Sequence, residues 1–191
     1  MKFQRGDLGY LQEVKKRERI LCGIQWGAVI AFLITGILAT KSRLNWFTLI
    51  AILSCLPAAK TTVGVIVKWT KKPIEPALVE EIEMYTEDLA VAYNLILTSN
   101  EKVMPIACMV AYDQTVYGYV TDEKVDVNQA TAYIKKILGQ QNFQKTTVKL
   151  FTEFKPFLAR VEGMKRIAEI HSTQNEVVTA EIKHAICLYS M

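Results

Sequence analysis

Two long apolar stretches fill much of the first third of the chain, with only a few residues between them. They cover residues 20–40 and 44–67. At about 1.5 Å per residue, a helix over the first stretch covers roughly 31 Å, close to the hydrocarbon thickness of a bilayer. The pattern therefore predicts a transmembrane hairpin over residues 20–67. Its short link, Lys41–Asn45, requires the two helices to be antiparallel neighbours.

A secretory signal peptide is the alternative interpretation of the first stretch. The apolar region of a signal peptide is shorter, and a second span does not follow so soon. Trp46 and Trp69 flank the second stretch, as expected for aromatic side chains at the two membrane interfaces. Both features favour the hairpin.

Residues 8–19 precede the first stretch and allow two interpretations. They could form a separate amphipathic helix on the membrane surface, with Leu8, Leu11 and Val14 toward the lipid. They could equally be a helical extension of the first span.

Small residues recur every fourth position in both predicted spans. Such stripes let two helix backbones approach closely. We favour packing of the hairpin on itself, and self-association with a second chain is the alternative. The two stripes are Gly23, Gly27 and Ala31 in the first span, and Ala51, Cys55 and Ala59 in the second.

Lys60 is an ionisable residue inside the second span, and Pro57 precedes it by one helical turn. An ionisable group at this depth is costly and is a functional candidate. Proline removes one helical hydrogen bond, which predicts a kink. Lys60 could line a substrate path or anchor a carboxylate of a partner helix. The interpretation we favour is that its side chain extends to the inner interface.

The remaining residues, 76–191, have the alternating and helical periodicities of a soluble domain. The predicted order is α-β-β-β-α-β-α-α, an α/β or α+β fold. The apolar character of both faces of residues 103–112 predicts a central strand. The predicted strands are 95–98, 103–112, 115–121 and 146–151, and the predicted helices are 75–94, 153–170 and 176–186. A further helix is capped by Asp126 or Asn128 and ends at Leu138, before Gly139. A short strand could follow the last helix.

Charge divides at the same boundary as hydropathy. Residues 1–73 carry a net charge of +9 and residues 74–191 carry −5. The Lys/Arg bias predicts a basic cytoplasmic segment 1–19, a basic linker 68–75, and both termini in the cytoplasm. The basic flanks suit anionic lipid head groups. The acidic domain lacks the clustered Lys/Arg that nucleic acid binding requires.

The order of the domain's elements resembles the core of restriction-endonuclease-like folds. That resemblance implies a carboxylate on the second strand and an acid-x-Lys motif on the third, which together hold a divalent metal. Asp113 and Asp122-Glu123-Lys124 are a formal match. Asp113 falls at a predicted turn, however, and Asp122 falls beyond the far end of the next strand. At about 3.3 Å per residue they are roughly 20 Å apart, whereas two acids that bind one metal lie within about 5 Å.

No other motif indicates catalysis, a metal or a cofactor. Cys22, Cys55, Cys108 and Cys187 have no spacing typical of a disulfide framework or a zinc cluster. They suit buried thiols in a reducing compartment. His184 and Cys187 are three residues apart, but two ligands are too few for a zinc site.

Tyr117 and Tyr119 alternate along one predicted strand and so share a face. If this face is exposed, it is a possible docking surface, because tyrosine is favoured at interfaces. The alternative, which we favour for an aromatic-rich central strand, is that a helix covers it.

These features lead to three hypotheses. We favour a non-catalytic interaction or regulatory module of the cell membrane, whose partners are the lipid bilayer and either another protein or a second copy. The first alternative is a degenerate, membrane-anchored enzyme related to nucleases, based on the resemblance above. The second is a small transport or channel subunit that uses Lys60.

Overall fold

The computed structural model describes residues 5–40, 46–70, 73–99, 102–170 and 176–190. The chain divides into two compact units. Residues 11–72 form one unit, and residues 1–10 join residues 73–191 in the other.

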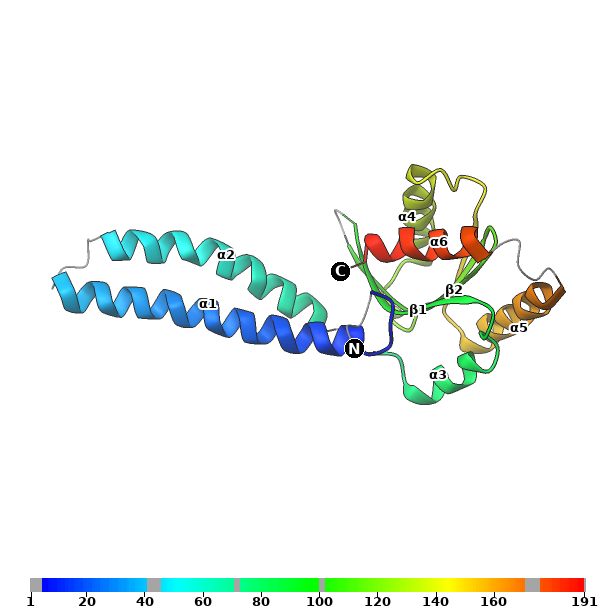
Figure 1. The fold of residues 1–191 in the computed structure, drawn as a ribbon, viewed down its shortest axis with the longest axis horizontal. Coiled ribbons are helices and arrows are strands. Elements are labelled where there is room, and N and C mark those ends of the chain that lie inside the picture. The colour runs from blue at the N-terminus through cyan, green and yellow to red at the C-terminus, as the bar shows by residue number, and fades with distance from the viewer. Residues whose placement is uncertain (1–4, 41–45, 71–72, 100–101, 171–175, 191) are drawn as a thin grey trace. The chain divides into compact units, whose positions relative to one another are not determined.

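The first unit consists of α1 (Tyr10–Thr40) and α2 (Trp46–Trp69), which lie side by side and antiparallel (Figure 1). Helix α1 is continuous from Tyr10, so the first predicted span is extended at its N-terminal end and no separate surface helix forms. Helix α2 passes through Pro57 without interruption. Both helices are long and apolar enough to cross a membrane. The predicted link, residues 41–45, lies outside the described residues.

The second unit confirms the predicted order of helices and strands. A four-stranded mixed sheet has the order β1-β2-β3-β4, in which the first three strands are antiparallel neighbours and β4 is parallel to β3. Strand β2 is therefore internal, as predicted. The elements are α3 (Pro76–Glu83), β1 (Ala90–Thr98), β2 (Val103–Tyr112), β3 (Thr115–Tyr119), α4 (Val127–Gln140), β4 (Thr147–Phe151), α5 (Phe154–Ile170) and α6 (Glu176–Leu188).

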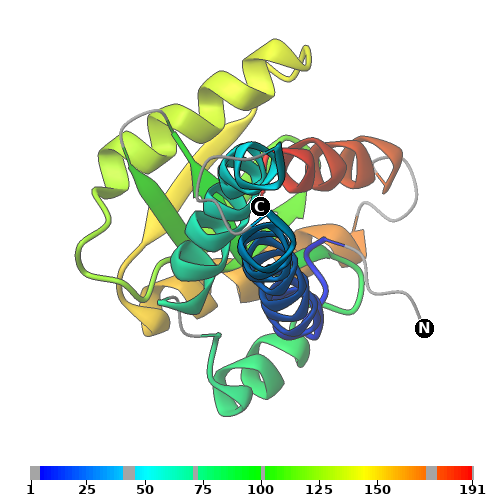
Figure 2. The ribbon, with the colours of Figure 1, turned by 90° about the vertical axis from the view of Figure 1, so that its left-hand side faces the viewer.

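Helices cover both faces of this sheet. Figure 1 and Figure 2 show α4 and α6 on one face and α3 and α5 on the other. Each face has its own apolar cluster, one centred on Ile134 and Ile182 and the other on Ile82 and Phe157. Two buried layers explain why both faces of β2 are apolar, because a sheet covered on both sides needs no polar face.

The predicted helix over residues 75–94 is only partly correct. Helix α3 ends at Glu83, and the chain joins the sheet from Ala90 onward, where Ala90 pairs with Ala111. The apolar spacing over this segment is compatible with a helix, but strand pairing with β2 buries the same residues. The capping role of Asp126 is confirmed, because its carboxylate accepts hydrogen bonds from the Asn128 and Gln129 backbone N–H groups at 2.9 and 3.1 Å.

Smaller differences concern the ends of the elements. Strand β3 stops at Tyr119, and α4 continues one residue beyond Gly139. The optional strand after the last helix is a single bridge between Leu97 and Ser190.

Candidate functional site

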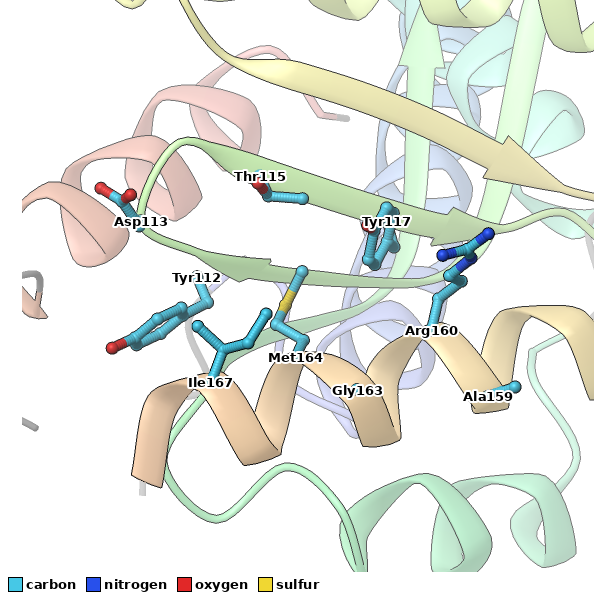
Figure 3. Close-up of a pocket in the computed structure, with 9 residues that line it drawn as sticks. All are labelled: Tyr112, Asp113, Thr115, Tyr117, Ala159, Arg160, Gly163, Met164 and Ile167. Atoms are coloured by element: carbon cyan, nitrogen blue, oxygen red, sulfur yellow. The ribbon is translucent and has the colours of Figure 1, made fainter. Parts of the chain in front are cut away.

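A groove of about 420 Å³ lies between the β2–β3 hairpin and α5 (Figure 3). Its volume falls within the range of sites for small molecules, about 300–1,000 Å³. We call it the α5 groove. It is lined by Tyr112, Asp113, Thr115, Tyr117, Ala159, Arg160, Gly163, Met164 and Ile167.

The groove exists because α5 has small residues on the side that borders it. Phe157, Val161 and Met164 anchor the helix in the core. Ala159 and Gly163 carry little or no side chain, and a Cβ added at Gly163 would meet no atom within 4 Å. The space above these two residues therefore remains open.

The hairpin wall of the groove carries hydroxyl groups. Thr115 and Tyr117 occupy alternate positions of β3 and are both half-buried. Alternate residues of a strand share a face and lie about 6.6 Å apart. Both side chains can therefore donate hydrogen bonds to one ligand.

The two ends of the groove carry opposite charges. Figure 3 shows the Arg160 guanidinium near Tyr117, whereas Asp113 lies on the hairpin turn at the other end. Asp113 has a φ of 50°, a conformation that aspartate tolerates better than most residues. Its backbone N–H donates to the Thr179 hydroxyl on α6 at 2.8 Å, which holds the turn in place.

The predicted tyrosine surface is divided between the groove and the core. Tyr119 is only 8% exposed, stacks on Phe157 at 5.8 Å and meets Phe154 edge-on at 5.5 Å. For Tyr119 the favoured alternative therefore holds, because α5 covers this side chain and it cannot form part of a docking surface. Tyr117 is half-buried and lines the groove.

The helical hairpin contains a second group of polar side chains, between α1 and α2. The Thr61 hydroxyl donates to Gln25 at 2.5 Å, and the Trp26 indole N–H donates to Thr62 at 3.0 Å. The Cys22 thiol also contacts Thr62, at 3.4 Å. These contacts pair polar side chains of α1 with polar side chains of α2 and favour the observed register of the two helices.

A charged pair lies at the end of the hairpin where both predicted spans meet their basic flanks. Glu18 accepts a hydrogen bond from the Lys68 ammonium, and the Lys68 side chain is buried. The Arg19 guanidinium lies 5.0 Å from the centre of the Trp69 ring. Residue 18 precedes the first span and residue 68 follows the second, so the structure brings the two predicted cytoplasmic ends together.

Lys60 and Pro57 are both exposed on α2. Among the residues that the structure describes, no acid pairs with Lys60. The nearby Thr62 hydroxyl donates to the Ala58 carbonyl within α2, at 2.7 Å. The substrate path and the partner anchor predicted for Lys60 remain predictions.

The small-residue stripes do not form the contact between α1 and α2 as expected. Gly23, Gly27 and Ala31 are exposed, and a Cβ at either glycine would meet no atom within 4 Å. In the second stripe Ala51 is buried, Cys55 is half-buried and Ala59 is exposed. Val29 and Ala58 are among the buried positions of the two helices that the sequence analysis missed.

The acidic residues that carry the resemblance to restriction-endonuclease-like folds do not lie close together in the structure. Asp113 precedes β3 and Asp122 follows it, so they lie at opposite ends of that strand. Within the described ranges, no group of three or more His, Cys, Asp or Glu side chains is arranged to hold a metal ion. Burial raises the pKa of the Cys108 thiol strongly and raises that of Cys187, so neither is an activated nucleophile.

Comparisons with models of known protein families, with curated proteins and with solved structures found no match for this chain.

Proposed function

We propose that the chain is a non-catalytic module of the cell membrane, held by α1 and α2, which uses the α5 groove of its second unit for interaction or regulation. The observation that carries this proposal is the exposure of the two helices. Only 11% of the most apolar stretch of each helix is buried within the structure. A core helix of a soluble protein has a similar composition but is mostly buried, so an apolar solvent is the better explanation of these surfaces.

The charge distribution supports an orientation with both termini in the cytoplasm. The net charge of +9 on residues 1–73 falls mainly on the flanks of the two spans. Cytoplasmic flanks carry an excess of Lys and Arg, and the anionic head groups of that leaflet attract them. The acidic second unit would then lie in the cytoplasm.

The inside of the hairpin supports the same proposal. Its two helices meet through small and polar residues, including Ala51, Ala58 and the Gln25–Thr61 pair. Small residues and interhelical hydrogen bonds are typical of helix pairs in membranes. The outward position of Gly23 and Gly27 leaves room for a further helix backbone, so self-association stays a prediction.

Alkaline extraction and protease protection test the proposal together. Membrane vesicles that carry the full chain with a C-terminal tag should retain it after alkaline carbonate treatment, because two spanning helices resist extraction. External protease should remove the tag only from inside-out vesicles. Release by carbonate would contradict membrane insertion, and digestion of the tag in right-side-out vesicles would contradict the orientation.

A further inference from the structure

We propose that the α5 groove binds an organic anion, a phosphate or carboxylate group attached to an apolar body. This inference rests on the proposed function, because it specifies what the module recognises. It begins with two cations that flank Tyr117 in a unit whose net charge is negative: Arg160 on α5 and Lys149 on β4.

Four cations lie on α5, and of Lys155, Arg160, Lys165 and Arg166 it is Arg160 that lines the groove. On the same helix, Arg166 pairs with Glu162 at 2.6 Å, and Lys165 donates to the Met84 carbonyl at 3.2 Å. In the described part of the chain, no hydrogen bond or ion pair involves Arg160. No acid lies three or four residues from it along the helix, where a neutralising partner would sit.

Lys149 adds a second positive charge on the same side of the sheet. It is the register partner of Tyr117 across the β3–β4 pair, and paired residues of neighbouring strands share a face. Its ammonium lies 5.2 Å from the centre of the Phe151 ring, and the side chain is exposed. The arginine fork of Arg160 matches the oxygens of phosphate or carboxylate, and the charge of Lys149 adds to the positive potential on this face of the sheet.

The remaining lining fixes the orientation of the ligand. The carboxylate of Asp113 disfavours an anion at the turn, so the anionic group belongs at the Arg160 end. Tyr117 and Thr115 can donate hydrogen bonds to that group or its ester oxygen. The apolar body would then lie against Met164 and Ile167; Ile167 is 53% exposed, and a ligand would cover it.

Titration of the full chain in dodecyl maltoside micelles with phenyl phosphate tests the inference. We expect single-site binding that weakens at least about tenfold in Arg160→Gln, because a charge-assisted contact is lost. Gly163→Leu should abolish binding, since its side chain enters the open space of the groove. Phenol, which lacks the anion, should bind more weakly than phenyl phosphate.

Two matched variants control for charge and for the added side chain. Arg166→Gln removes a paired arginine from the same helix, and Gly139→Leu adds a side chain at a glycine of α4 that also faces open space. Both should bind phenyl phosphate as the parent chain does. The inference would be overturned if the parent chain did not bind phenyl phosphate. It would also be overturned if Arg160→Gln and Gly163→Leu bound it as tightly as the parent chain does.

A membrane lipid or a soluble metabolite could supply the same anionic group. Phosphatidic acid added to the micelles should displace phenyl phosphate if the natural source is a lipid, and should leave it bound if the source is soluble. Both outcomes of this displacement experiment require that phenyl phosphate binds in the α5 groove. Because the titration is done in micelles, it can succeed where carbonate extraction fails, or fail where extraction succeeds, so the two proposals are tested separately.

Discussion

A single asparagine determines how the chain enters the sheet. Asn94 has a φ of 53° in the middle of β1, and its side-chain oxygen accepts a hydrogen bond from the Ile74 backbone N–H at 2.8 Å. Left-handed backbone interrupts the alternation of a strand. Ala92 and Leu95, an odd number of residues apart, consequently belong to the same apolar cluster. Nothing in the apolar pattern of residues 90–98 indicated this reversal.

Two substitutions of Asn94 should separate the contributions that its backbone conformation and its hydrogen bond make to stability. Asn94→Ala should lower the free energy of unfolding by about 2–3 kcal/mol, because alanine is strained at this φ and the hydrogen bond to Ile74 is lost. Asn94→Gly relieves the strain and should cost only about 1 kcal/mol. Pulse proteolysis of the full chain across a urea series in micelles measures both. Equal losses in the two variants would show that the backbone conformation carries no cost.

At the scale of elements, the hairpin shows what periodicity leaves undetermined. Both spans have small residues at helical spacing, but spacing alone does not say which side of a helix meets its partner. Polar pairs such as Gln25–Thr61 and Glu18–Lys68 favour the observed face, because unpaired polar groups are costly away from water. The stripe of Gly23, Gly27 and Ala31 therefore points outward.

The pair Glu18–Lys68 should hold the ends of α1 and α2 together. Glu18→Ala and Lys68→Ala should each destabilise the hairpin by about 1–3 kcal/mol, because each leaves a charged group without its partner. The exchange Glu18→Lys with Lys68→Glu should recover most of that loss. Thermal unfolding in micelles, followed by helical circular dichroism, is the measurement.

An exposed pair on α5 is the control for this prediction. Glu162 and Arg166 are one turn apart on a helix surface, and such pairs contribute only about 0.3–0.5 kcal/mol. Glu162→Ala should therefore leave the unfolding temperature almost unchanged. If Glu18→Ala has an equally small effect, the contact with Lys68 does not stabilise the hairpin.

At the scale of the whole molecule, both ends of the chain contribute to one edge of the sheet. The Tyr93 N–H donates to the Gly6 carbonyl at 2.7 Å, and the Ile96 N–H donates to the Ser190 hydroxyl at 3.1 Å. The Arg5 guanidinium also donates to the Leu188 carbonyl at 2.9 Å. Strand β1 is an edge strand, and unpaired edges promote association with other chains. These segments therefore protect the edge.

Gly6 is suited to this role by its missing side chain. Its φ is 96°, and a Cβ there would lie 3.0 Å from the Cys187 sulfur and 3.1 Å from the Ala92 Cβ. The position therefore requires both the backbone freedom and the small size of glycine.

A fragment comparison tests whether the N-terminal segment belongs to the folded domain. Residues 1–10 joined to residues 73–191 by a short Gly/Ser linker should be more stable than residues 73–191 alone, by about 1–3 kcal/mol, because the longer fragment keeps the contacts of Arg5 and Gly6. Urea unfolding measures the difference, and amide exchange at Tyr93 should be slower in the longer fragment. Identical stability and exchange would show that the segment only passes over the sheet.

The sequence alone determined the separation of apolar and acidic parts, the order of the elements, the internal position of β2 and the Asp126 cap. Each depends on periodicity or on neighbours within one helical turn. Tertiary structure decided the outward side of α1, the strand conformation of residues 90–94, the pairing of Gly6 with Tyr93 and the α5 groove. These depend on residues far apart in sequence: Gly163 opens space only because α5 packs against the strand that carries Tyr117.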